Sequence, residues 1–367
     1  MARSKRITHA ATGIIAIAVL AVMYSLFFAR SLLVPIAFAI LFDFLLSPLV
    51  RVLGKLKIPS VAAAALVMLS LIGVLVATAY ELRGPVEKFL VDAPESVSKA
   101  QVQLGRFLQP LQRVSDNAAK VASVTGSPGG GVQPAQVVVV GPSMVSRLAG
   151  TSQRFIGGLL QVLLLLFFLL AGGDLFLEKT ISLLPLLQDK KKAVRIAREI
   201  ESAVSVYLIA NLGINVVEGI IVGVALWALG LPNALLWGTI IVGVEFIPYI
   251  GAIVMISSLS LAALATFDDL THILLVPIAY IVANFIMGNI VTTLVLGRRL
   301  ALNSVALFIG LAFWFWIWGI PGAFIGVPLM SVIKICCDHI ESLAPIGEFL
   351  GARNESPRAI VIADAPV

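Results

Sequence analysis

The chain of 367 residues is 59% hydrophobic and only 13% charged, and its mean hydropathy is +1.04. Soluble domains carry about 45–50% apolar and about 25% charged residues, so this composition excludes a water-soluble globular protein. It predicts an all-α, polytopic integral membrane protein surrounded by a lipid bilayer. The net charge of +6 comes from basic residues beside apolar segments, without interleaved aromatic residues, so we expect no nucleic-acid partner.

Apolar runs long enough to cross a bilayer begin near the N-terminus, since about 20 such residues suffice for one helix. The single spans that we expect lie at 11–29, 31–50, 60–82, 154–177, 203–229 and 272–296. The regions 233–267 and 303–337 are each too long for one straight span, and each contains a Pro/Gly break near its middle. The N-terminal run resembles a signal peptide but lacks a small-x-small cleavage site, so we expect an uncleaved anchor.

The basic residues predict the orientation of these spans. If the N-terminus is cytoplasmic and the chain crosses at each span, most of the 26 lysines and arginines fall on inner segments, and Arg30 stands alone in the short outer loops. The others lie in or beside one long outer segment, where the positive-inside rule has little force. We therefore expect a multi-pass protein of the cytoplasmic (inner) membrane with both termini in the cytoplasm.

These assignments divide the chain into five parts. Residues 1–82 form N-terminal transmembrane helices, and residues 83–152 form an extracytoplasmic amphipathic helical segment. This segment contains the Gly/Pro-rich loop TGSPGGGVQP and then QVVVV, which could be a short strand. Residues 153–202 combine a transmembrane helix with a basic stretch, either a helix on the cytoplasmic surface or a solvated connector. Residues 203–340 form the transport core, and residues 341–367 form a cytoplasmic tail.

The core contains an internal repeat. YLIAN at 207–211 matches YIVAN at 280–284, and the same displacement places Ile247-Pro248 on Ile320-Pro321. The two repeats, 203–267 and 272–338, would run in opposite directions, because the span at 203 starts beside inner basic residues and the span at 272 ends beside them. Inverted repeats with broken helices are typical of secondary transporters. Each broken region could be a re-entrant hairpin or two short crossings.

The first break, VEFIPYIGAIV at 244–254, places the carboxylate of Glu245 three residues before Pro248. A proline removes a backbone donor, so we expect Pro248 and Pro321 to leave carbonyls unpaired. A membrane tolerates this only against protein or a watery cavity. Each break could coordinate an ion, or it could be a plain kink. Glu245 is the sharpest candidate, because an intramembrane carboxylate usually faces a cavity or a partner and could there exchange a proton or a cation.

Further polar residues of the core extend this predicted substrate and ion pathway. Its members are Glu245, Pro248, Tyr249, Gly251, Asn211, Asn215, Glu218, Asn284, Asn289, Thr292, Gly319, Pro321 and Gly322, with Asp43 as a secondary candidate. The asparagines could offer neutral oxygen ligands or could join helices by hydrogen bonds. The pairs Gly219/Gly223 and Gly322/Gly326, each separated by three residues, predict close helix packing.

The sequence contains no His-Glu-x-x-His, Gly-x-Ser-x-Gly or Walker motif. Its three histidines are scattered, and its two cysteines, Cys336 and Cys337, are neighbours that point apart on a helix. We therefore expect no enzymatic activity, no catalytic residue, no metal site and no cofactor, apart from Na⁺ or H⁺ as a coupling ion.

Two blocks of the sequence are similar to a known family. EFIPYIGA at 245–252 resembles the Phe-Ile-Pro-Tyr-Ile/Val-Gly signature of the autoinducer-2 exporter family of permeases. GRRL at 297–300 and WGIPGAFIGVPL at 318–329 resemble a second block of that family. The resemblance runs over most of 11–337 and implies about eight transmembrane helices with an extracytoplasmic helical insertion. It also implies a homo-oligomer, such as a pentamer, and export of a small solute or ion in exchange for Na⁺ or H⁺.

Two positions depart from this family. Glu245 stands where the family often has Asn, and Thr292-Thr293 stands where it often has Glu-Pro. One carboxylate is therefore missing near the second break, while another is present at the first. The sequence predicts a permease or exporter that works by alternating access with Na⁺ or H⁺ exchange. The alternatives are a passive channel through the same breaks and a scaffold that organises the envelope through its outer segment.

Overall fold

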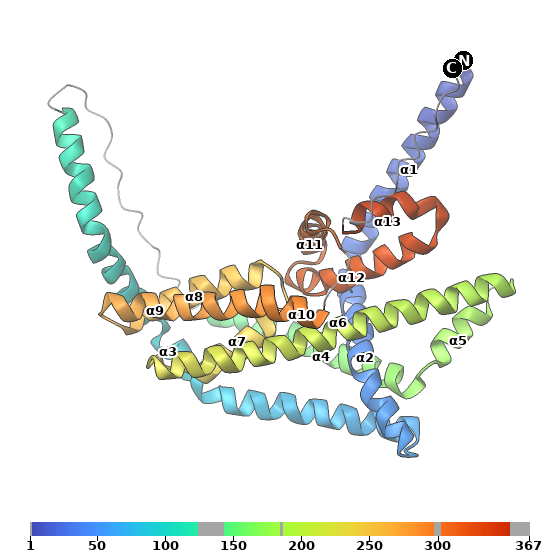
Figure 1. The fold of residues 1–367 in the computed structure, drawn as a ribbon, viewed down its shortest axis with the longest axis horizontal. Helices are drawn as coiled ribbons and strands as arrows, with labels where there is room; N and C mark the ends of the chain where they lie inside the picture. Colours follow the sequence, from blue (N-terminus) through green and yellow to red (C-terminus); the bar gives the residue numbers. More distant parts are fainter. Residues whose placement is uncertain (1, 124–142, 184–185, 297–301, 353–367) are drawn as a thin grey trace, which may run out of the picture. The chain divides into compact units, whose positions relative to one another are not determined.

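The computed structural model describes residues 2–123, 143–183, 186–296 and 302–352 (Figure 1). Within these ranges the regular structure is helical, and the β-type pairing is one isolated bridge between Leu302 and Gly351. The expected loop TGSPGGGVQP, the possible strand QVVVV and the arginines Arg298 and Arg299 lie outside the described residues.

The helices follow one another with short connections. In chain order they are α1 Ala2–Phe28, α2 Arg30–Lys55, α3 Ser60–Ser123, α4 Ser143–Gly172, α5 Leu175–Ser182, α6 Leu187–Ala228, α7 Ala234–Val244, α8 Ile250–Thr266, α9 Leu270–Phe285, the π-helix η1 Ile286–Val291, α10 Thr292–Leu296, α11 Ser304–Trp318, α12 Ile320–His339, the 3₁₀ helix η2 Glu341–Leu343 and α13 Ala344–Leu350.

Among the described residues, five segments are long and apolar enough to cross a membrane. They are Arg30–Lys55, Ser60–Phe89, Gln188–Ala228, Leu270–Val295 and Ile320–His339. Shorter apolar helices lie at Ile17–Phe28, Ile156–Gly172, Ala234–Val244, Ile250–Thr266 and Ser304–Trp318. The protein is therefore an all-α, polytopic integral membrane protein, as the composition predicts.

The chain forms two compact units, each built from separate stretches of sequence. The first unit contains Met1–Met68, Gly158–Ala210 and Leu296–Val367, and the second contains Leu69–Gly157 and Asn211–Val295. In the first unit α12 packs against α11, α2 and α13. In the second unit α8 packs against α7 and α9. The two repeats predicted from the sequence thus do not coincide with the two units.

Two helices are longer than the sequence pattern suggests. The helix α3 continues without interruption from the apolar span at its start through the polar stretch to Ser123. The helix α6 joins the basic stretch and the following apolar span in one helix of 42 residues. No glycine or proline occurs in α6 before Gly213, so nothing in its sequence separates the basic turns from the apolar ones. The basic stretch is therefore the start of α6.

The second unit contains a helical hairpin made of α7 and α8, with its turn at residues 245–249. The two helices run antiparallel, since one cavity is lined by Leu231 and Leu236 from the start of the hairpin and by Leu261 and Thr266 from its end. The 11 residues of α7 extend about 16 Å at a rise of about 1.5 Å per residue, roughly half of an apolar core about 30 Å thick. The region 233–267 is therefore a helical hairpin whose first arm, α7, is too short to cross the apolar core by itself.

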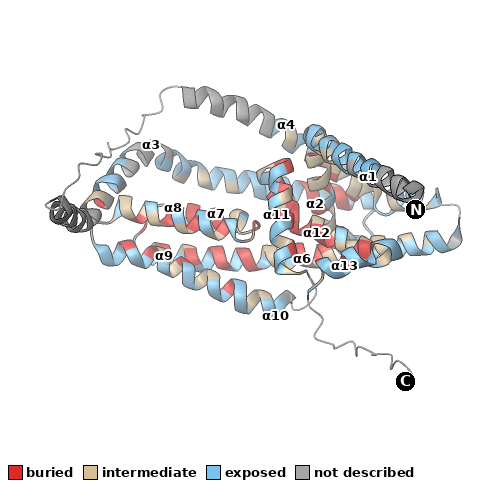
Figure 2. Ribbon diagram, turned by 90° about the horizontal axis from the view of Figure 1, so that it is seen from above, coloured by how far each residue is buried: buried red, intermediate tan, exposed pale blue. Residues whose placement is uncertain are grey.

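A core of buried side chains holds this hairpin against α6 and α9. It consists of Val222, Leu226, Leu231, Ala234, Trp237, Ile241, Met255, Leu259, Ala263, Val276 and Tyr280. Figure 2 shows buried positions in red along α7, α8 and α9. The helix α3 also reaches the hairpin: the ring of Phe89 meets that of Trp237 edge-on at 5.7 Å, and Gln103 Nε2 donates to Asp268 Oδ1 at 2.8 Å.

Glycines allow the closest of these helix contacts. A Cβ atom on Gly219 of α6 would collide with the backbone of Gly238 on α7, and one on Gly238 would collide with Gly219. In the first unit, a Cβ on Gly322 would collide with the backbone of Trp314, and one on Gly326 with the side chain of Leu311. The prediction that these glycine pairs allow close helix packing is confirmed.

The second Pro/Gly break differs from the first. The helices α11 and α12 form a hairpin whose turn is the single residue Gly319, with φ 68° and ψ −146°. Pro321 lies in the first turn of α12, where a missing N–H leaves no helical bond unmade. The predicted break in 303–337 is therefore confirmed between Trp318 and Ile320, but Pro321 starts the second helix and does not free a carbonyl within a helix. Pro248 lies in the turn between α7 and α8, also outside a helix interior.

Candidate functional site

The site is built around the turn of the α7–α8 hairpin. Glu245 follows the last residue of α7, and Tyr249 precedes α8 with a positive φ of 64° and ψ of −47°. This backbone conformation is unfavourable for a bulky residue. The N–H of Gly251 donates to Ile247 O at 2.8 Å, and a Cβ on Gly251 would collide with the backbone of Val244. Gly251 therefore lets the start of α8 fold back closely over the end of α7.

Four polar side chains from three parts of the second unit meet beside this turn. The hydroxyl of Tyr280 on α9 donates a short hydrogen bond to Glu245 Oε1. Asn284 lies one helical turn further along α9, and its Nδ2 donates to Glu218 Oε1 on α6 at 3.0 Å. Asn284 also hydrogen-bonds Glu245, and the two carboxylates are close enough to interact electrostatically. We call these four residues the polar cluster, and Glu218 and Glu245 the carboxylate pair.

The polar cluster lies near the middle of the membrane-spanning helices. Glu218 is ten residues from Ala228 at the end of α6, and Tyr280 is ten residues from Leu270 at the start of α9. Ten residues of helix rise about 15 Å, which is half of the apolar thickness of about 30 Å. Both helices and the hairpin turn therefore place the cluster at similar depth, where Glu218 is only 3% exposed.

The carboxylate pair has no basic partner in the part of the chain that the structure describes. The ion pairs found there involve Arg51, Lys99, Arg198, His272, Lys334 and His339, and none of them contacts Glu218 or Glu245. Two ionised carboxylates at this depth would repel each other and would each carry a desolvation cost. The arrangement is stable when a proton or a cation neutralises part of this charge.

Two of the remaining predicted asparagines, Asn215 and Asn289, donate to backbone carbonyls. Asn215 on α6 donates weakly from Nδ2 to Val242 O at 3.5 Å, near the end of α7. The buried Nδ2 of Asn211 has no hydrogen-bond partner among the described residues. Asn289 and Thr292 lie at the π-helix η1, where Asn289 Nδ2 donates to Phe285 O at 3.1 Å and Thr292 Oγ1 donates to Met287 O at 2.8 Å. These two residues bond within their own helix and outside the polar cluster.

Other predicted pathway residues belong to the first unit. Gly319 is the turn between α11 and α12, and Pro321 and Gly322 lie in the first turn of α12. Asp43 on α2 lines a cavity of about 600 Å³ together with Arg51, Asp174 and Glu201. Of the lining residues, Arg51 pairs with Glu201, and Asp174 pairs with Arg198 at 2.6 Å. Asp174 and Glu201 are thus paired with arginines, unlike the carboxylate pair of the second unit.

Tyr280 is the site residue that reasoning from the sequence did not identify as functional. Tyr280 belongs to the repeat motif YIVAN, and its spacing of four residues from Asn284 places both side chains on one face of α9. That spacing was the available signal. The π-helix η1 was not anticipated, although such local expansions frequently occur at functional sites in helices.

The chain is similar to known transport proteins over nearly its whole length. Residues 14–342 match the model of the AI-2E family transporter. The AI-2 transport protein TqsA of Escherichia coli (strain K12) is 24% identical over 330 residues, which cover 89% of this chain and 92% of TqsA. The transport protein YueF of Bacillus subtilis (strain 168) is 24% identical over 319 residues, which cover 84% of this chain and 84% of YueF. This chain belongs to the AI-2E transporter family and is a membrane transporter.

Proposed function

We propose that this transporter moves a small solute or ion across the cytoplasmic membrane, by alternating access, in exchange for H⁺ or Na⁺ bound at the carboxylate pair. The observation that carries the proposal is the buried Glu218 beside Glu245, joined through Asn284, with no ion pair to a basic residue in the described chain. A site of this charge and depth favours a proton or a small cation. A single carboxylate packed between helices, without the second carboxylate, would not favour such a cation site.

The hairpin turn supports a cycle of binding and release. Glu245 lies at the turn, while Glu218 and Tyr280 lie on the long helices α6 and α9. A movement of the turn relative to these helices would separate Glu245 from Tyr280 and Asn284 and would change the affinity for the cation. The unfavourable backbone of Tyr249 lowers the cost of rearranging this turn. Alternating exposure of the pair to the two sides of the membrane would then couple cation and solute movements.

The remaining features of the proposal follow from the sequence and the family. We propose export as the direction of solute movement, with both termini in the cytoplasm and a homo-oligomer, such as a pentamer, as the assembled form. The two broken regions would act as inverted repeats, and only the first would carry acidic groups, because Trp318 and Val291 occupy the positions that match Glu245 and Glu218. TqsA is named for AI-2 transport, and AI-2 is therefore one of the solutes to include in the test.

The test is flux in proteoliposomes under imposed H⁺ and Na⁺ gradients, comparing Glu245→Gln with the parent. We expect the parent to drive solute against its gradient with one of the two ions, and Glu245→Gln to lose this dependence. Equal flux in both proteins that ignores the gradients and does not saturate would contradict the proposal and would indicate a passive channel. Loss of function on deleting 83–152, with Glu245→Gln harmless, would indicate an envelope-organising scaffold.

A further inference from the structure

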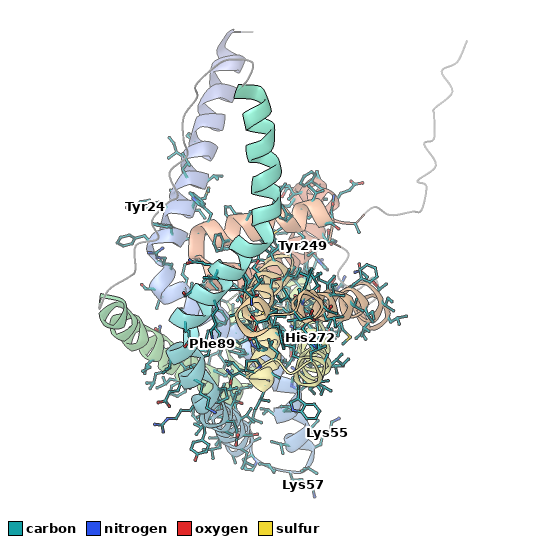
Figure 3. All side chains as sticks on the ribbon, turned by 90° about the vertical axis from the view of Figure 1, so that its left-hand side faces the viewer. Tyr24, Lys55, Lys57, Phe89, Tyr249 and His272 are labelled. Atoms are coloured by element: carbon teal, nitrogen blue, oxygen red, sulfur yellow. The ribbon has the colours of Figure 1, made fainter. Side chains whose placement is uncertain are left out.

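A cavity of about 340 Å³ lies between the two arms of the α7–α8 hairpin, away from the turn. Its walls come from the start of the hairpin, including Leu236 and Trp237, and from α8 between Val254 and Thr266. The helix α3 contributes Phe89, which is labelled in Figure 3. All of these residues belong to the second unit. A volume of this size is in the range of sites for small molecules, which is about 300–1,000 Å³.

The lining of this cavity is uncharged. Most of it is aliphatic or aromatic, and the rings of Phe89 and Trp237 meet at 88° within its wall. Its polar side chains are Asn233, Ser258 and Thr266. Thr266 donates its hydroxyl proton to Ala262 O at 2.8 Å, so its oxygen can still accept a hydrogen bond. Asn233 makes no capping hydrogen bond at the start of α7.

The polar groups distinguish between the occupants that an apolar cavity could take. A lipid acyl chain would fill the apolar volume but would offer no hydrogen-bonding partner to the Ser258 hydroxyl or the Asn233 amide. A charged solute would find no opposite charge in the lining. A neutral solute with a mainly apolar body and one or two hydroxyl or carbonyl groups satisfies both conditions.

We propose that this cavity binds the transported solute, and that the solute is a neutral, mainly apolar small molecule with one or two hydrogen-bonding groups. The inference rests on the proposed function, because it takes the occupant to be the molecule that is moved. It also assigns separate places to the two transported species. The cation binds at the carboxylate pair beside the hairpin turn, and the solute binds between the arms toward their open end.

The test uses a neutral alkanol that carries a photoreactive diazirine, such as azi-octanol, on the full chain in lipid nanodiscs. Mass spectrometry locates the adducts. We expect saturable labelling centred on the segments of Trp237 and Ser258, abolished by Ala262→Trp, which fills the cavity. Ile253→Trp is the matched control, because Ile253 lies on the same helix, outside the cavity lining, and is 63% exposed. It should leave the labelling unchanged.

A second variant guards against misfolding of Ala262→Trp. Ser258→Ala removes one hydroxyl without adding volume. We expect it to weaken labelling about 2- to 10-fold, which is the effect of losing one uncharged hydrogen bond. It should also raise the solute concentration for half-maximal transport. Labelling that does not saturate, or that is spread equally over Ile253 and the cavity, would overturn the inference and indicate an acyl chain. Labelling is measured without any ion gradient, so loss of gradient-driven flux in Glu245→Gln tests the proposed function separately.

Discussion

Replacing Tyr280 by phenylalanine removes one hydroxyl that donates to the carboxylate of Glu245 and leaves the buried ring in place. The hydroxyl stabilises the ionised carboxylate relative to its protonated form, so without it Glu245 should keep its proton to higher pH. A hydrogen bond to a charged group contributes about 1.5–3 kcal/mol, which corresponds to a shift of about 1–2 pH units. Because Asn284 still donates to Glu245, the lower part of this range is expected.

The assay is solute-driven proton movement in proteoliposomes, measured with an internal pH dye over a series of external pH values. The pH of half-maximal coupled transport should rise in Tyr280→Phe. The matched control is Tyr207→Phe, which removes a buried tyrosine hydroxyl from the corresponding position of YLIAN. No shift in Tyr280→Phe, a downward shift, or an equal shift in Tyr207→Phe would refute the reasoning.

Three further variants test neighbouring parts of the account. Asn284→Ala removes the donor shared by both carboxylates and should shift the same pH profile further than Tyr280→Phe. Its control is Asn289→Ala, which removes an exposed amide bonded to Phe285 O. This control should have the pH profile of the parent. Gly251→Ala places a methyl group against the backbone of Val244 and should lower the free energy of unfolding by about 1–3 kcal/mol, seen as a lower thermal midpoint in detergent. Gly243→Ala has open space around it and should not lower that midpoint. Arg198→Gln breaks exposed ion pairs with Asp174 and Glu201. It should change the free energy of unfolding by at most about 1 kcal/mol. A larger loss would contradict the interpretation of these contacts as ordinary surface ion pairs.

The sequence predicts the membrane class and the approximate spans because apolar length and composition determine them directly. It also identifies Glu245, since a carboxylate three residues before a proline in an apolar run is conspicuous. The sequence does not predict which of these side chains form hydrogen bonds with one another across the fold. Tyr280 is 35 residues from Glu245, and Asn284 is 66 residues from Glu218, so the contacts depend on how the hairpin packs against α6 and α9.

The two breaks show how local sequence can mislead. Both contain Ile-Pro, yet Pro248 lies in a turn of several residues while Pro321 starts a helix directly after Gly319. A glycine followed within two residues by a proline is a common way to end one helix and begin the next, and this signal could have corrected the expectation. The π-helix η1 lacked such a signal, because its sequence IMGNIV resembles that of an ordinary apolar helix.

The central claim is that the carboxylate pair couples a cation to solute movement. The most direct measurement compares two activities of the double variant Glu218→Gln/Glu245→Gln in proteoliposomes. One activity is exchange of labelled for unlabelled solute without any gradient, and the other is accumulation of solute driven by an H⁺ or Na⁺ gradient. The account predicts that exchange persists while gradient-driven accumulation is lost. Accumulation at the level of the parent protein would contradict it.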